Sequence, residues 1–506
     1  MKIKNFIFLS LILSSSPLYA GLIDSGVTVE DLPHFSLNSL GTSTVLSTDI
    51  WRHSNETDLF YLIDKIGTTN LTPASRKALI LLLTQDSTGY QSNNPDNNQI
   101  EFLSRRLKAL LRLGAFDEIL SLIDRIPNEM QSDEILQIKI STLLLTGQIL
   151  EAEKIIHNTD FGLFTSKANI NLFLEKEEKN KSILSYEMYK ENPDESDPLF
   201  SALGENVLLE LEHQIPENIS ATHEHVFLLS RLKNKNIESF AQTQDVKTIL
   251  TQLPSTPIET RISLAEKIYL SAEELAKIYK LPLFDIKIDT NALKRAELYQ
   301  KIKSSADQNE KATLLNELIQ SALTDKVILN IAPLLEAELN TIIPTQDNIF
   351  LAFPAVQIYG LGKNLEKAYE WYQKLAENSA ENHQKERLML IPILQHLGAG
   401  LPIETASLFS KFCAHKMDLT CTGFIDRIDT SFDFELNIHR NNLELIVPFE
   451  YLKKENESKV GENLIKAILD LNDPSIQNKT HIIEYIKFST PKAFSRDIIQ
   501  EGLIYQ

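Results

Sequence analysis

Two leucine-rich runs, each broken by a glycine and followed by an acidic residue, constrain the fold of this chain most. LLRLGAFDEIL at 110–120 contains Gly114 and Glu118, and LLLTGQILEAE at 143–153 contains Gly147 and Glu151. A glycine that ends a helix readily adopts the left-handed conformation, and a carboxylate in the first turn of the next helix interacts favourably with the helix dipole. The pattern therefore predicts two helical hairpins, 33 residues apart.

This helix–turn–helix signal resembles the tetratricopeptide repeat through its turn pattern Gly-x-aromatic-x-Glu-Ala. The first copy has Phe116 at the aromatic position and Ile119 in place of the alanine. The second copy has Ile149 at the aromatic position and keeps the small packing residue, Ala152. The resemblance implies an α-solenoid of helical hairpins, in which each hairpin packs on its neighbours.

A later stretch, YGLGKNLEKAYEWYQKLAEN at 359–378, resembles the related Sel1-type repeat. The residues that carry the resemblance are Gly362, Glu366, Ala368, Trp371 and Tyr372, and Gly398 follows Gly362 at a spacing of 36. Trp371 and Tyr372 have two interpretations. At this spacing aromatic residues most often fill the core between two helices, but aromatic residues also anchor partners in grooves.

The rest of the mature chain also favours helices. Only 16 of the 506 residues are glycine, whereas the usual share is about 7%. The segments WRHSNETDLFYLIDKIG, LSAEELAKIYKLPLFD and KRAELYQKIKSSAD resemble a group of secreted alphaproteobacterial proteins of helical pattern, whose function is unsettled. That resemblance implies a helical fold and export, and no activity.

The pattern divides the chain into six parts. They are a signal peptide (1–20), an extended or disordered lead-in (21–50), an N-terminal helical-repeat region (51–260), a central helical region (261–350), tetratricopeptide- or Sel1-like repeats (351–430) and a C-terminal region (431–506). One exception to the helices is FDFELNI, whose strict alternation is typical of a strand. With LELIV it predicts a small β-hairpin near 432–447, and a helix beginning near Asn442 is the alternative.

The first twenty residues have the layout of a secretory signal peptide. Lys2 and Lys4 precede an apolar run that is too short to span a bilayer, and small residues lead to Ala20, after which we expect cleavage. These features predict a periplasmic protein. In that oxidising compartment Cys413 and Cys421 are expected to form one disulfide.

Charge and hydropathy exclude several classes of partner. The net charge of −19 disfavours phosphate backbones and anionic lipid headgroups, so we expect neither nucleic-acid binding nor direct binding to a membrane surface. No later stretch reaches the length of a transmembrane helix. The expected partner is an envelope protein or peptide.

Candidate catalytic and ligand sites are weak. Gly360, Gly362 and Lys363 lack the further glycine and the Ser or Thr of a phosphate-binding loop, so an interhelical turn is favoured. Four residues that could bind zinc lie close together in the sequence, but at spacings that do not put them on one helix face: His213, His223, Glu224 and His225. We predict no metal, no cofactor and no catalytic residue.

Three functions stay open. Stacked hairpins favour a protein-binding scaffold or adaptor in the cell envelope. The alternative is a protein that binds or hydrolyses peptidoglycan, because soluble lytic transglycosylases also have an α-superhelical part. The Glu-Ser pairs of this chain lack the Gly-Leu-Met-Gln that follows the catalytic pair in those enzymes. A structural envelope component is the third.

Overall fold

The structure, a computed structural model, describes residues 40–47, 49–67, 71–86, 95–191, 197–216, 219–232, 237–284, 286–378 and 460–473, with further positions between 383 and 394 and between 482 and 498. They belong to one compact unit, Leu37–Gln506. Several predictions lie outside the described residues: the signal peptide with cleavage after Ala20, the pair Cys413 and Cys421, Gly398, and the β-hairpin at 432–447.

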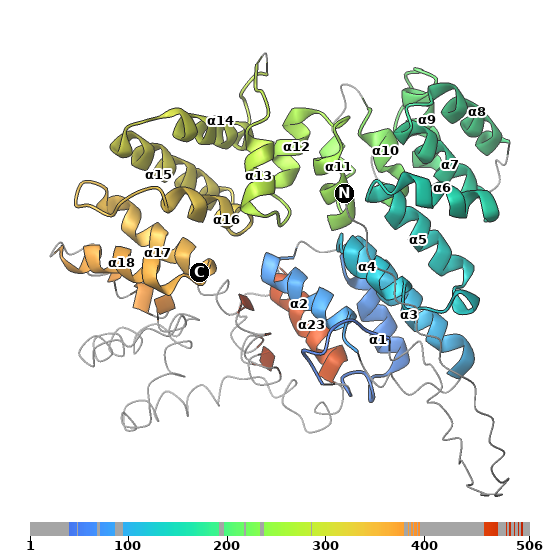
Figure 1. Cartoon of the computed structure of the whole chain (residues 1–506), viewed down its shortest axis with the longest axis horizontal. Coiled ribbons are helices and arrows are strands. Elements are labelled where there is room, and N and C mark those ends of the chain that lie inside the picture. The colour runs from blue at the N-terminus through green and yellow to red at the C-terminus, as the bar shows by residue number, and fades with distance from the viewer. Residues whose placement is uncertain are drawn as a thin grey trace, which may run out of the picture. The chain divides into compact units, whose positions relative to one another are not determined.

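Helices build the described part of the chain, which contains no strand, so the predicted all-α hairpin fold is confirmed (Figure 1). The first helices are α1 (Glu56–Lys65), α2 (Pro73–Leu83), α3 (Pro95–Arg112), α4 (Phe116–Ile123), α5 (Asp133–Leu145), α6 (Ile149–Asn158), α7 (Leu163–Glu175), α8 (Lys179–Lys190) and α9 (Pro198–Val207). There follow the 3₁₀ turn η4 (His223–His225), α10 (Val226–Leu229), α11 (Gln244–Gln252), α12 (Ile258–Ala265), α13 (Ala272–Tyr279), α14 (Asn291–Ser304), α15 (Gln308–Thr324), α16 (Ile328–Leu339), α17 (Ala352–Leu361), α18 (Leu365–Ala376) and α23 (Val460–Asn472). Shorter 3₁₀ turns are η2 (Asn128–Met130), η5 (Ile237–Ser239) and η6 (Ile349–Leu351).

One turn geometry joins five pairs of consecutive helices. The second residue after the first helix is left-handed, and the next helix starts two residues later; these residues are Gly114 (φ +67°), Gly147 (+73°), Glu177 (+58°), Lys326 (+58°) and Lys363 (+60°). In each turn the following N–H donates to a carbonyl five residues back, as Ala115 N does to Leu110 O at 3.0 Å. This hydrogen-bond pattern is the Schellman motif, which satisfies the free carbonyls at a helix end.

The turn after α17 differs in detail from its sequence pattern. Gly362 lies at the helix end with φ −71°, and the left-handed residue is Lys363. A Cβ at Gly362 would come within 2.0 Å of the Glu336 carboxylate, the end of a flexible side chain that would have to move aside. The phosphate-loop alternative does not apply, because Gly360 is within α17 and the loop is this interhelical turn.

Three largely buried arginines cap the ends of the first helices. Arg76 Nε donates to Leu113 O, Arg106 Nε to Leu83 O and Arg112 Nε to Ile66 O, each at 2.7 Å. These carbonyls are at or just beyond the C-terminal ends of α3, α2 and α1, where the helix dipole favours a cation. The arginines therefore link α3 to both α1 and α2.

Apolar side chains form three cores along the chain. The first core unites buried residues at 40–138 with others at 464–498, the middle core lies within 140–264, and the last core lies within 262–394. The described end of the predicted lead-in takes part in the first core, since Leu40 and Leu46 are buried and Thr42 N donates to Thr84 O at 2.8 Å.

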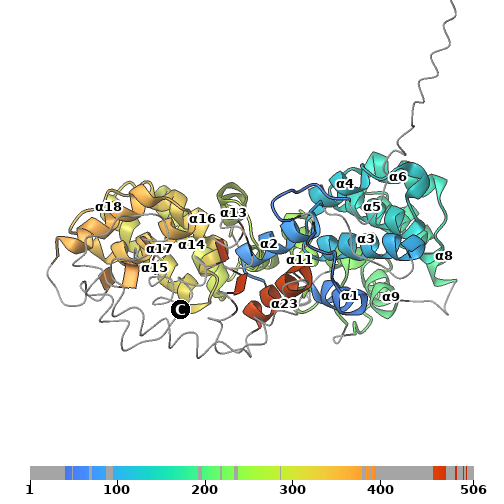
Figure 2. The same cartoon turned by 90° about the horizontal axis from the view of Figure 1, so that it is seen from below.

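Helix α23 returns from the far end of the sequence to α1 and α2, beside which it lies in Figures 1 and 2. Gly461 N donates to Ile50 O at 3.0 Å, and the Glu462 carboxylate accepts from Asn55 N at 3.0 Å. Asn472 Oδ1 accepts from Thr72 N at 2.9 Å. Side chains of α23 thus satisfy backbone groups at the starts of both α1 and α2.

None of the described helices combines the length and the apolar character that crossing a membrane requires.

Candidate functional site

Residues 219–232 and 237–252, called here the inner segment, lie against the first helices of the N-terminal hairpins. In it, η4 packs on α5 and α7, α10 packs on α7, and α11 packs on α3. Phe227 is buried beside Leu144 and Ala168, and the Arg231 guanidinium donates to Leu174 O at 3.1 Å. The chain itself therefore covers the faces of α3, α5 and α7 that a bound peptide could otherwise occupy.

Charged residues line the seam between α7 and the inner segment. Lys167 Nζ on α7 lies 2.8 Å from Asp197 Oδ2 and 2.8 Å from Glu224 Oε2. Asn171, one turn further along α7, donates to Glu224 O at 2.9 Å. One ammonium group thus joins α7 to the start of α9 and to η4.

His225 has its tautomer fixed by its neighbours. Its Nδ1 lies 3.0 Å from Thr222 N, an amide that can only donate, so the ring proton is on Nε2, which lies 3.0 Å from Asp197 Oδ2. Thr222 Oγ1 is 2.9 Å from the same Nδ1. The Thr222 hydroxyl, the His225 imidazole and the Asp197 carboxylate thus form one chain of contacts. Because Nδ1 already accepts the amide, this imidazole caps the start of η4 and is not free to act as a base for Thr222.

Protonation equilibria in the seam follow burial and charge. Burial raises the pKa of Asp197, but the hydrogen bonds from His225 and Lys167 outweigh it and hold the pKa well below its usual range. Burial lowers the pKa of His223 and raises that of Asp245, whose carboxylate lies 4.0 Å away. The second pair is therefore favoured in its neutral form.

A small hollow opens between α5, α7 and η4. It is lined by both apolar and polar side chains, among them Leu144, Phe164, Lys167, Asn171 and His223. The hollow has room for about one water molecule. Asn171 Oδ1 and Asp245 Oδ1 are buried without a hydrogen-bond partner in the structure. The hollow is too small for a substrate.

The structure separates the residues that the sequence grouped as potential zinc ligands. His225 bonds Asp197, His223 faces Asp245, and His213 lies 3.4 Å from Glu205. Within the described ranges, no group of three or more His, Cys, Asp or Glu side chains could hold a metal ion.

A second polar cluster, centred on Arg295, lies inside the last core. Arg295 Nε donates to Glu266 Oε1 at 2.9 Å, and its Nη1 donates to Asp325 Oδ2 at 2.6 Å. Tyr279 also donates to the Glu266 carboxylate. Arg295 and Glu266 are each 2% exposed. This cluster ties α12, α13, α14 and α15 together, and it reaches solvent only at Asp325, whose side chain is 27% exposed.

The residues of the predicted repeats take positions that stabilise hairpins. Glu118, Glu151 and Glu366 lie in the first turns of α4, α6 and α18. Ala152 and Ala368 are fully buried.

Trp371 and Tyr372 belong to the last core, with exposures of 1% and 6%. The structure therefore favours the core interpretation of this aromatic pair. The alternative, a surface that anchors a partner, does not fit their burial.

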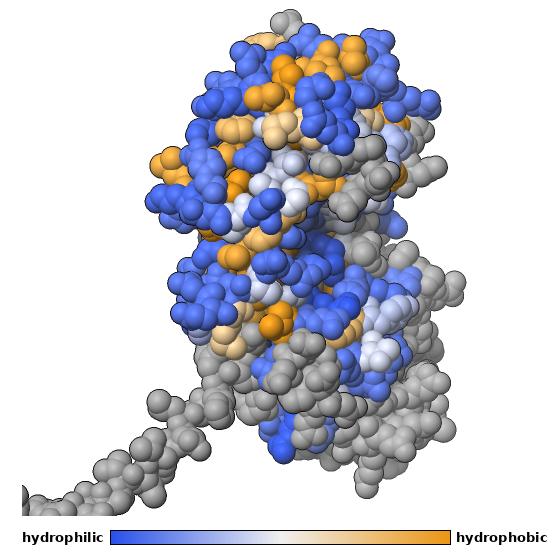
Figure 3. All heavy atoms as spheres, turned by 90° about the vertical axis from the view of Figure 1, so that its right-hand side faces the viewer, coloured by the Kyte–Doolittle hydropathy of each residue, from blue (hydrophilic) through white to orange (hydrophobic). Residues whose placement is uncertain are grey.

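Large apolar side chains are exposed instead on the second helices of two hairpins. Leu184 and Met188, one turn apart on α8, are 63% and 59% exposed, and Leu150 in the first turn of α6 is 72% exposed. The space-filling view of the face that carries α8 shows apolar residues scattered among hydrophilic ones (Figure 3). These side chains are available to a partner, whereas the inner faces of α3, α5 and α7 are not.

Sequence reasoning missed the seam and the Arg295 cluster. Lys167 stands in an otherwise apolar and neutral helix, LFTSKANINLF, and such a lone cation is the signal that could have marked a buried pair. Its partner Asp197 is 30 residues away in the sequence, and no spacing rule predicts a contact at that separation.

Comparison with known proteins gives no relative: no family model matches this chain, and no curated protein or solved structure is significantly similar to it.

Proposed function

We propose that this protein is a helical-repeat scaffold or adaptor of the cell envelope, working in the periplasm and binding a protein partner. The observation that carries the proposal is the contrast between the two sides of its N-terminal hairpins. The inner faces of α3, α5 and α7 are covered by the chain itself, while α8 exposes Leu184 and Met188. The signal-like first twenty residues support the compartment.

The partner would contact the exposed side of α8. Leu184 and Met188 are four residues apart and therefore share one face of the helix. Lys181 and Lys190 flank them, but each lies within 3.1 Å of a glutamate carboxylate of its own helix region. The surface thus has two neighbouring apolar side chains with paired charges around them, and protein–protein interfaces likewise place apolar side chains within a polar rim.

The test is capture of partners in cells. The tagged protein is crosslinked in the cell envelope and its partners are identified by mass spectrometry, for the natural chain, for Leu184→Asp/Met188→Asp and for Asn180→Asp. Asn180 is exposed on the same helix, so its change controls for added charge. We expect one dominant envelope protein, retained by Asn180→Asp and lost by the double variant.

Binding of that protein to the purified variants should follow the same order. Equal capture by the double variant and the natural chain would remove α8 from the proposal. Capture of background alone would overturn the adaptor function and favour the peptidoglycan alternative, which binding of purified cell-wall fragments would then measure.

A further inference from the structure

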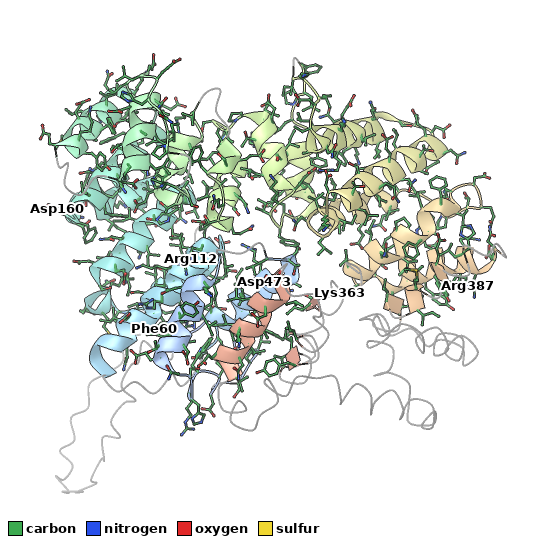
Figure 4. The ribbon with its side chains drawn as sticks, turned by 180° about the vertical axis from the view of Figure 1, so that it is seen from behind. Phe60, Arg112, Asp160, Lys363, Arg387 and Asp473 are labelled. Atoms are coloured by element: carbon green, nitrogen blue, oxygen red, sulfur yellow. The ribbon has the colours of Figure 1, made fainter. Side chains whose placement is uncertain are left out.

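Asp497 connects two parts of the molecule that are far apart in the sequence. Its carboxylate lies 3.3 Å from Lys77 Nζ on α2 and also pairs with Lys363 Nζ in the turn between α17 and α18. Its neighbours Phe494 and Ile498 are buried in the first core. Asp497 is thus carried by the first core and reaches the turn that closes the last described hairpin. Figure 4 shows Lys363 on the side of α17 that faces the end of α23, marked by Asp473.

The charges of this contact favour a persistent but salt-sensitive ion pair. Burial raises the pKa of Asp497, but the hydrogen bond and charge of Lys363, together with the charge of Lys77, outweigh it. The pKa is therefore lowered and the carboxylate stays ionised. Lys77 and Lys363 are 65% and 41% exposed, so dissolved ions can reach both ammonium groups. At about 1 M salt the screening length falls to about 3 Å, and such pairs weaken.

Little else joins these regions in the described part of the chain. Neither α17 nor α18 makes an extensive contact with α1, α2 or α23. The side chain that reaches across to Asp497 is Lys363, which occupies the left-handed position of its turn. Two of the other turns have glycine at this position and therefore no side chain. A lysine at this position costs backbone energy, and its pairing with Asp497 is the contact that it gains.

We propose that Asp497 is an electrostatic clasp, which holds the α17–α18 turn against the first core and opens when its charge is screened or removed. The clasp would let the last hairpins separate from the first core without unfolding either core. It is a conformational device and does not depend on the proposed partner surface on α8.

The clasp can be tested by lysine crosslinking. Lys77 and Lys363 both contact one carboxylate, so a short amine-reactive crosslinker should join them in the full-length protein. The yield is normalised to a link between Lys277 and Lys280, which lie at one end of a single helix, α13. We expect the yield of the Lys77–Lys363 link to fall by about fivefold in Asp497→Asn. The same fall is expected for the natural chain in about 1 M salt, because a loss of this size corresponds to two half-exposed ion pairs.

Two further variants separate the clasp from general damage. Asp497→Glu keeps the charge and should retain most of the link, and Asp473→Asn removes a nearby charge outside the pair and should leave it unchanged. Circular dichroism confirms that each variant is folded. A link that is absent in the natural chain, or equally strong in Asp497→Asn and at high salt, would overturn the proposal.

Discussion

Two N-terminal hairpins, α3–α4 and α5–α6, share one turn with the two that end the described array, α15–α16 and α17–α18, yet the two pairs build it from different residues. Gly114 and Gly147 hold the left-handed position in the first two hairpins, whereas Lys326 and Lys363 hold it in the last two, with φ values between +58° and +73° throughout. A non-glycine residue pays about 1 kcal/mol or more in this conformation. The hydrogen bonds of the helix end and the packing of the two helices therefore impose the turn, and glycine only makes it easier.

The two halves also differ in how they hold buried charge. In the last core, Arg295 is surrounded by Glu266, Asp325 and Tyr279, and both carboxylates bind it directly. In the seam, Lys167 is paired, but Asn171 Oδ1 nearby has no partner. The first is a polar cluster, buried apart from Asp325, that joins four helices. The second joins the hairpins to the inner segment with one buried amide oxygen left unsatisfied, and it is expected to open at lower cost.

The largest effect should come from the Arg295 cluster. Glu266→Leu leaves the Arg295 charge and the Tyr279 hydroxyl buried with fewer partners, and we expect the free energy of unfolding to fall by about 3 to 5 kcal/mol. Urea denaturation followed by circular dichroism measures it. Glu273→Leu, on the exposed pair with Lys277, is the control and should change little. A loss no larger than that of the control would show that the cluster does not hold the last core together.

A smaller loss is expected from the arginine caps of the first core. Arg106 is fully buried, its pKa is lowered to about 10 by burial, and it donates to Leu83 O and Gln85 O. Arg106→Met frees both carbonyls, so the unfolding free energy should drop by about 2 to 3 kcal/mol. Arg105→Met, one residue away and partly exposed, should cost less than about 1 kcal/mol. Similar urea midpoints for the two variants would contradict the capping role.

The contribution of the seam to the free energy of unfolding should depend on pH. The pKa of Asp197 is lower in the folded than in the unfolded chain, so its contribution is present above about pH 4 and is lost as pH falls toward the folded pKa. At pH 7 we expect Asp197→Asn to be less stable by about 2 kcal/mol, because Lys167 and His225 lose the carboxylate. Urea unfolding at a series of pH values should show this difference narrowing as the pH falls below about 4. A difference that is independent of pH would mean that the ionised carboxylate does not stabilise the seam.

Sequence patterns revealed the helical fold better than they revealed the seam and the Arg295 cluster. The reason is that the fold depends on local features, whereas the two polar sites join residues far apart in the sequence. The stops at Gly114 and Gly147, the acidic first turns at Glu118 and Glu151 and the small Ala152 are local features, so periodicity and glycine mark them. The turns at Glu177 and Lys326 escaped notice, because a charged residue at a left-handed position carries no signal of its own. Lys167 with Asp197, and Arg295 with Glu266, depend on the stacking of hairpins, which spacing along the chain does not encode.

The smallest predicted effect tests the shared turn most directly. Gly147 and Glu177 occupy the same position in successive hairpins, and a Cβ at Gly147 would meet no atom within 4 Å, so substitutions there report mainly on the backbone. Urea unfolding of Gly147→Ala and Glu177→Gly, each against the natural chain, is the measurement. We predict that alanine at 147 lowers the unfolding free energy by about 1 kcal/mol and that glycine at 177 raises it by about 0.5 to 1 kcal/mol. If glycine at 177 destabilised the chain as much as alanine at 147 does, the two turns would not share one geometry, and the account of a single repeated hairpin would be wrong.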